Sequence, residues 1–161
     1  MRFIASESIA TEANVIYERH RDIVRSLIPT ARVEHIGATA IPTALTKGDV
    51  DLLVVVDPKV FAEAEAVLAQ RYERNEGSER SATFAAFIDP EGAIPVGLQL
   101  VADGSPDEVA FRAAQTRLKE PSTLARYNRL KERFRGKSPD KYLEAKASFI
   151  AELLETDASQ D

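Results

Sequence analysis

The chain has 161 residues, of which 44% are hydrophobic and 29% charged, and its net charge is −5. These values suit an ordinary globular protein with a sizeable core, so we expect one domain over residues 1–161. The absence of cysteine excludes disulfides and thiolate metal sites. The polar first segment and the lack of a long apolar run predict a cytoplasmic protein without a membrane anchor.

Helix and strand patterns alternate along the chain. Residues 1–8 are expected to form an extended arm, residues 73–80 a polar loop, and the tail from about Thr156 to be disordered. Helical spacing of apolar residues, together with proline, glycine and capping signals, predicts five helices, over residues 11–28, 58–72, 106–119, 121–135 and 139–155. Apolar runs bounded by turn residues predict four strands, over residues 32–36, 49–56, 82–88 and 94–101.

These elements predict an α/β (α+β) fold. We expect a mixed, twisted sheet of four or five strands with helices packed against it, and further helices at the C-terminus. Residues 89–92 read as the turn of a hairpin between the last two strands. The strand over residues 49–56 should lie inside the sheet, because its second half is apolar on both faces.

The most informative stretch joins the first two strands. A turn of small residues, Gly37-Ala38-Thr39, follows the first strand, and Asp49 and Asp51 open the second. Side chains alternate along a strand, so the two carboxylates should project to the same face. Such a pair repels unless a cation or proton intervenes, and Mg²⁺ prefers oxygen ligands of this kind.

This order of residues resembles the nucleotidyltransferase superfamily, in which a turn of glycine, a small residue and a hydroxyl residue precedes Asp-x-Asp on a hydrophobic strand. The segment from His35 to Pro42, with Lys47, resembles the GrpB family within it. The likeness extends over roughly residues 30–155 and includes a C-terminal set of matching residues, namely Tyr127, Leu130, Lys131, Tyr142, Lys146, Phe149 and Ile150.

The resemblance implies a nucleotidyltransferase-like fold and Mg²⁺-dependent transfer of a nucleotidyl group from a nucleoside triphosphate to an unknown acceptor. Asp49 and Asp51 would be the catalytic and metal-binding residues. Nucleotide or phosphate would be bound by Gly37, Ala38, Thr39 and Lys47, although Ala38 replaces the serine usual in the superfamily. Possible further site residues are His35, Gln99, Arg126 and Lys131.

One departure keeps other functions open. Active nucleotidyltransferases carry a third carboxylate on a strand beside the aspartate pair, and here the polar candidate is Gln99, which cannot accept a proton. The alternatives are a catalytically impaired module that binds a nucleotide or another phosphorylated small molecule, and a scaffold or accessory domain that acts through protein contacts.

The charge distribution bears on the partner. Residues 111–146 hold eleven Lys or Arg and four acidic residues, a net of +7, so the remainder carries −12. A basic half opposite an acidic pair suits a polyanion bound beside a metal, whereas most of these charges are read as solvated helix faces. Nucleic acid is an unlikely partner for an acidic protein, and the sequence does not predict the oligomeric state.

Overall fold

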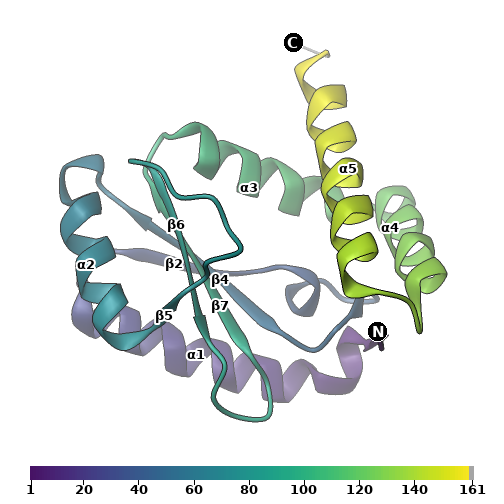
Figure 1. Cartoon of the computed structure of the whole chain (residues 1–161), viewed down its shortest axis with the longest axis horizontal. Helices are drawn as coiled ribbons and strands as arrows, with labels where there is room; N and C mark the ends of the chain where they lie inside the picture. The colour runs from purple at the N-terminus through teal and green to yellow at the C-terminus, as the bar shows by residue number, and fades with distance from the viewer. Residues whose placement is uncertain (160–161) are drawn as a thin grey trace.

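A five-stranded mixed sheet crosses the molecule (Figure 1). The structure, a computed structural model, describes residues 1–159. In spatial order the strands of the sheet are β2 (Arg32–Ile36), β4 (Val50–Val56), β7 (Val96–Ala102), β6 (Phe84–Asp89) and β5 (Glu73–Arg74). β4 and β7 run parallel and the other neighbours antiparallel, so the expected mixed sheet is confirmed. A separate ribbon pairs β1 (Ile4–Ala5) with β3 (Leu45–Thr46).

β4 lies inside the sheet, between β2 and β7. Residues 52–56 are at most 2% exposed, as expected for a strand with two apolar faces. The strand begins one residue later than predicted, so Asp49 lies just outside it. β5 falls in a segment that we expected to be loop, because two polar residues at a sheet edge carry no apolar alternation.

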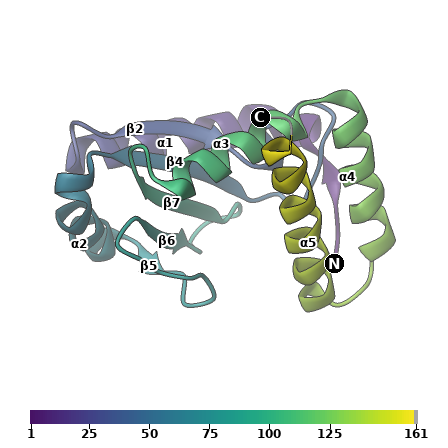
Figure 2. The same cartoon turned by 90° about the horizontal axis from the view of Figure 1, so that it is seen from above.

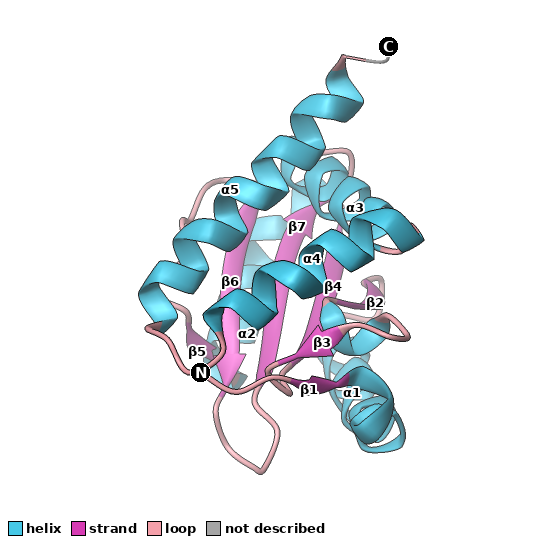
Figure 3. Cartoon of the chain, turned by 90° about the vertical axis from the view of Figure 1, so that its right-hand side faces the viewer, coloured by secondary structure: helices cyan, strands magenta, loops and turns pink. Residues whose placement is uncertain are grey.

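Helices cover both faces of the sheet, and two more stand at one end of it (Figures 1 and 2). α1 (Ala10–Leu27) and α2 (Phe61–Arg71) enclose the main core on one face, and α3 (Pro106–Leu118) packs on the other. Figure 3 shows α4 (Pro121–Phe134) and α5 (Pro139–Ala158) side by side. All five helices were predicted. α5 continues through Ala158, past Thr156, where we expected a disordered tail to begin, and residues 160–161 of that tail lie outside the described residues. Within residues 1–159, no helix is both long and apolar enough to cross a membrane.

The first residues of the chain are tied to the C-terminal helices. The backbone N–H of Gly136 donates to the carbonyl of Met1 at 2.8 Å. Arg135 Nη1 donates to the carbonyl of Phe3 at 2.9 Å, and the Phe3 ring lies edge-on to that of Tyr142, with 5.3 Å between ring centroids. The arm at residues 1–3 therefore holds the turn between α4 and α5 against the rest of the molecule.

A buried carboxylate fixes the start of α3. The Ser105 hydroxyl accepts a hydrogen bond from the Glu108 backbone N–H at 3.2 Å, which is one half of a capping box. The Glu108 carboxylate reaches back to the N–H of Gly104 at 2.6 Å, one residue before the expected position. Both contacts satisfy backbone groups that would otherwise be left unpaired at the start of a helix.

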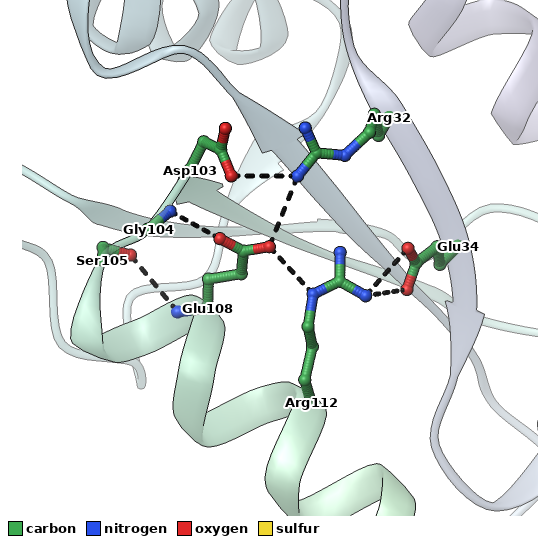
Figure 4. Close-up of polar contacts among 7 residues, drawn as sticks. All are labelled: Arg32, Glu34, Asp103, Gly104, Ser105, Glu108 and Arg112. Carbon is green, nitrogen blue, oxygen red and sulfur yellow. Dashed lines mark hydrogen bonds and ion pairs between the residues drawn. The ribbon is translucent and has the colours of Figure 1, made fainter.

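The same carboxylate joins a network of charges that docks α3 on the sheet (Figure 4). Arg112 donates to Glu108 at 2.8 Å and, through Nη1, to both carboxylate oxygens of Glu34 on β2, at 2.9 and 2.7 Å. Arg32, also on β2, contacts Glu108 at 3.4 Å and Asp103 at 3.0 Å. The network sets the position of α3 along β2.

Candidate functional site

A cavity of about 540 Å³ opens where the start of β4 meets α3, α4 and α5. Its size suits a small molecule. Two acidic and three basic side chains line the end of the cavity that lies at the start of β4, which we call the β4 end. One further acidic side chain in the lining comes from α3. The five at the β4 end are Lys47, Asp49, Asp51, Lys131 and Lys146.

Asp51 sits between two glycines. On β7, Gly97 is the register partner of Asp51, and a Cβ built on Gly97 would lie 2.5 Å from Oδ1 of the aspartate. A Cβ on Gly37 would lie 2.8 Å from Oδ2, and Gly37 also has a φ of +79°, which disfavours other residues. The two glycines therefore make the space that this carboxylate occupies.

Asp49 lies close enough to Asp51 to shift the pKa of that carboxyl. Burial, and then the negative charge of Asp49, raise the pKa of Asp51 to about 6, while Lys146 and Lys47 act in the opposite direction. Lys47 Nζ lies 3.6 Å from Oδ2 of Asp49. A second positive charge beside the pair would relieve the repulsion, so the donor set fits a cation such as Mg²⁺.

His35 and Thr39 brace the turn and do not line the cavity. The Thr39 hydroxyl donates to the backbone carbonyl of Asp49 at 3.1 Å, and Nε2 of His35 lies 2.9 Å from the same hydroxyl. The His35 ring stacks on Tyr17, with 5.0 Å between ring centroids, and burial lowers its pKa. These contacts fix the backbone at Asp49.

Gly37 and Ala38 reach the cavity surface, but the N–H of Gly37 is already engaged. It donates to Oε1 of Gln115 at 3.0 Å, and Nε2 of Gln115 donates back to the Gly37 carbonyl at 3.4 Å. Gln115 lies on α3 and was not predicted as a site residue, because a lone glutamine in an amphipathic helix gives no signal. It clamps the glycine that was expected to approach a phosphate.

Two lysines from the C-terminal helices face the aspartates. Lys131, on α4, is only 2% exposed, donates to the carbonyl of Leu45, and lies 4.0 Å from the centroid of the Tyr127 ring. Burial, and then the positive charge of Lys146, lower the pKa of Lys131 to about 7. Lys146, on α5, was quoted in the family resemblance but was not predicted as a site residue.

Of the two remaining predicted residues, Gln99 lies at the cavity and Arg126 does not. Gln99 lines the cavity, and its amide lies near Gly97. Arg126 is not part of the lining; it pairs with Glu152 at 2.8 Å and stacks over Phe149. Over residues 1–159, no three His, Cys, Asp or Glu side chains are grouped so that they could hold a metal ion.

Sequence comparisons identify relatives along almost the whole chain. The family model described as GrpB protein matches residues 8–156. A UPF0157 protein of Vibrio cholerae serotype O1 is 29% identical over 154 residues, which are 96% of this chain and 82% of the relative. A UPF0157 protein of Deinococcus radiodurans is 33% identical over 143 residues, or 86% of this chain and 74% of the relative.

Solved structures show the same fold. The conserved protein GrpB from Enterococcus faecalis superposes with a TM-score of 0.74 at 18% identity, covering 96% of this chain and 98% of that one. The Cid1 poly(U) polymerase, solved with MgGTP bound, superposes with a TM-score of 0.52 at 16% identity. That match covers 80% of this chain but 42% of the polymerase. The fold is therefore nucleotidyltransferase-like.

Proposed function

Because this chain belongs to the GrpB family and has a nucleotidyltransferase-like fold, we propose that it binds a nucleoside triphosphate with Mg²⁺ beside Asp49 and Asp51 and transfers the nucleotidyl group to an acceptor. The observation that supports this most directly is that Asp49 and Asp51 line one cavity together with three lysines, where the charge of Asp49 helps to raise the pKa of Asp51. Carboxylates and cations at one end of a small-molecule cavity suit a metal–phosphate ligand.

Mg²⁺ fits the two carboxylates because this ion is commonly held by one or two carboxylates together with substrate phosphates. When bound, it would neutralise charge on the phosphate oxygens and help to orient the α-phosphate. Asp51, fixed between Gly37 and Gly97, would present its oxygens in one orientation. Asp49, whose backbone is held by Thr39, would supply the second carboxylate.

The lysines would bind the phosphates. Lys47 extends from the segment before β4, and Lys131 and Lys146 come from α4 and α5. A polyphosphate beside them would be contacted by cations from three segments of the chain, and water would be excluded as the ligand filled the cavity. In the proposed reaction an acceptor oxygen bonds to the α-phosphorus of the nucleotide and pyrophosphate leaves.

A second candidate function is a module that binds the same kind of ligand without catalysing a reaction. The glutamine at position 99 favours it, because this side chain occupies the cavity wall near Asp51 and cannot accept a proton. Asp107 is a further carboxylate in the cavity lining. One of its oxygens, Oδ2, is already engaged, because it accepts a hydrogen bond from the Thr83 hydroxyl at 2.7 Å.

Thermal unfolding tests the binding step shared by both functions. We expect one or more nucleoside triphosphates to raise the melting temperature in millimolar Mg²⁺, because the ligand binds the folded state. Asp51→Asn should abolish the Mg²⁺-dependent part of the shift, and Asp140→Asn, at an exposed position of α5, should not. A panel of nucleotides that gives no shift would contradict both functions, and release of pyrophosphate would distinguish the enzyme from the module.

Gly97→Ala provides a second test that leaves the chemistry of Asp51 unchanged. The added methyl group would press against the carboxylate, so we expect loss of the Mg²⁺-dependent shift and destabilisation by about 1–3 kcal/mol. Gly77→Ala is the matched control, because neither glycine has a positive φ and the methyl at position 77 meets only a flexible side chain, at 3.4 Å. Normal Mg²⁺-dependent binding by Gly97→Ala would show that the position of Asp51 does not matter.

A further inference from the structure

The part of the cavity away from the aspartates is apolar. α3 and α5 face each other across it, and each contributes residues at helical spacing. Those on α3 are Phe111, Ala114 and Leu118, and those on α5 are Leu143, Ala147, Ile150 and Leu154. Leu143 remains 50% exposed although it belongs to this wall, so part of the apolar lining has no protein partner.

Polar side chains on this side are already occupied. Gln115 exchanges two hydrogen bonds with the backbone of Gly37, and Asp107 accepts one from the Thr83 hydroxyl. A ligand group between α3 and α5 therefore meets mainly methyl, methylene and phenyl surface, with the Asp107 carboxylate as a charged exception. Affinity for a ligand at such a surface depends on the apolar area that the ligand buries. It does not depend on a pattern of hydrogen-bond donors and acceptors.

The opposite end of the same cavity is suited to an anion. Lys47, Lys131 and Lys146 offer amino groups as hydrogen-bond donors beside Asp49 and Asp51, and a bound divalent cation would make this end of the cavity positive. One cavity of about 540 Å³ thus joins a cationic end to an apolar end. The chemical complement is a small molecule with an anionic head and an apolar body.

The residues near Asp51 indicate which attacking group an acceptor would carry. A hydroxyl acceptor must lose a proton as it attacks phosphorus, and Gln99 cannot take that proton. The oxygen of a phosphate monoester needs no such base, because its second pKa is near 6 and it is already deprotonated at neutral pH. The lysines are also suitable partners for a second phosphate group.

We propose that the acceptor is an alkyl or aryl phosphate monoester, with its phosphate at the lysines and its apolar body between α3 and α5. This inference rests on the proposed function. In the reaction, a phosphate oxygen of the acceptor bonds to the α-phosphorus of the nucleoside triphosphate, and the bond from that phosphorus to the pyrophosphate oxygen breaks. The products are a diphosphate diester and pyrophosphate, with no proton to be removed from the nucleophile.

A series of n-alkyl phosphates from ethyl to octyl, titrated calorimetrically at pH 7.5, tests the proposal. Each added methylene should tighten binding about three- to four-fold until the apolar end is full. Leu143→Ser should weaken octyl phosphate about five-fold and leave ethyl phosphate unchanged, because the side chain contacts only the body of the ligand. Val109→Ser, at a 61% exposed position of α3 outside the cavity, should change neither affinity.

The outcomes separate this inference from the proposed function. Affinity that does not depend on chain length, in a protein that still binds nucleotide with Mg²⁺, overturns the inference alone. Failure to bind either nucleotides or alkyl phosphates overturns both. Octyl phosphate should also stimulate pyrophosphate release from the nucleotide, and octanol should not; the opposite result would identify a hydroxyl acceptor and overturn the proposal.

Discussion

Two ionisable side chains of the candidate site are buried at a cost to stability. The pKa of Asp51 is raised to about 6 and that of Lys131 is lowered to about 7, in each case mainly by burial. Both shifts favour the neutral form, which means that folding works against the charges that a metal–phosphate ligand would use. Perturbed groups of this kind in a cavity are typical of functional sites.

Lys131 makes stability depend on pH in a direction that can be measured. Between pH 7 and 9 the unfolded chain keeps this lysine protonated while the folded protein loses the proton. The free energy of unfolding should therefore rise with pH, by about 2 kcal/mol over that window. Urea denaturation at several pH values measures it. Lys131→Met should remove the rise and Lys141→Met, at an exposed position of α5, should retain it; a rise that survives in Lys131→Met would contradict the assignment.

The site residues differ in how far the sequence reveals them. Strand alternation predicts a common side for Asp49 and Asp51, and both line the cavity although Asp49 lies one residue before β4. Lys131 and Lys146 lie about 80 and 95 residues further along the chain, so only the family resemblance connects them with the aspartates. Arg126 was a possible site residue, but it lies one position from Tyr127 on α4, about 100° around the helix, and so faces outward.

At the scale of elements, the features that sequence predicts well are those with a local cause. Apolar runs predict β4, and a serine before proline predicts the start of α3. β5 and the β1–β3 ribbon are missed because two-residue strands depend on partners remote in sequence. The docking of α3 is equally hidden, since Arg112 and Glu34 are 78 residues apart.

The charged network under α3 should contribute to stability because Glu108 is buried and holds three partners, Arg32, Arg112 and the Gly104 N–H. The substitution Glu108→Gln removes the negative charge of this side chain but keeps its size and shape. We expect it to lower the free energy of unfolding by about 1–3 kcal/mol, less than for a fully buried pair because both arginines are partly exposed.

Chemical denaturation measures the loss in the free energy of unfolding that we expect for Glu108→Gln. The control is Glu132→Gln, which breaks the exposed ion pair with Arg135 and should cause no measurable loss. Equal effects of the two variants would show that burial of Glu108 is unimportant. Loosening α3 should also weaken ligand binding, because this helix carries Gln115 and one apolar wall of the cavity.

For the molecule as a whole, the basic C-terminal half is not a single binding surface. Lys131 and Lys146 line the cavity, whereas several arginines of the same segment pair with acidic neighbours, among them Arg112, Arg126 and Arg135. The net of +7 over residues 111–146 therefore divides between an interior charge cluster and ordinary helix surface, and the amphipathic helix patterns predict the latter for most of these residues.

The contact between Met1 and Gly136 also constrains when the site can form during synthesis. The sheet can assemble once residues up to Ala102 have left the ribosome, but the arm at residues 1–3 then lacks its partners on the C-terminal helices. At typical elongation rates, the 95 residues from Asp51 to Lys146 take roughly 5–20 s to add. Ribosome-bound chains that end after Ala102 should bind no nucleotide, whereas full-length chains on a long tether should bind it. Until α4 and α5 have been synthesised and have folded, the aspartates are exposed to water. A nascent chain therefore cannot bind a nucleotide in an incomplete site.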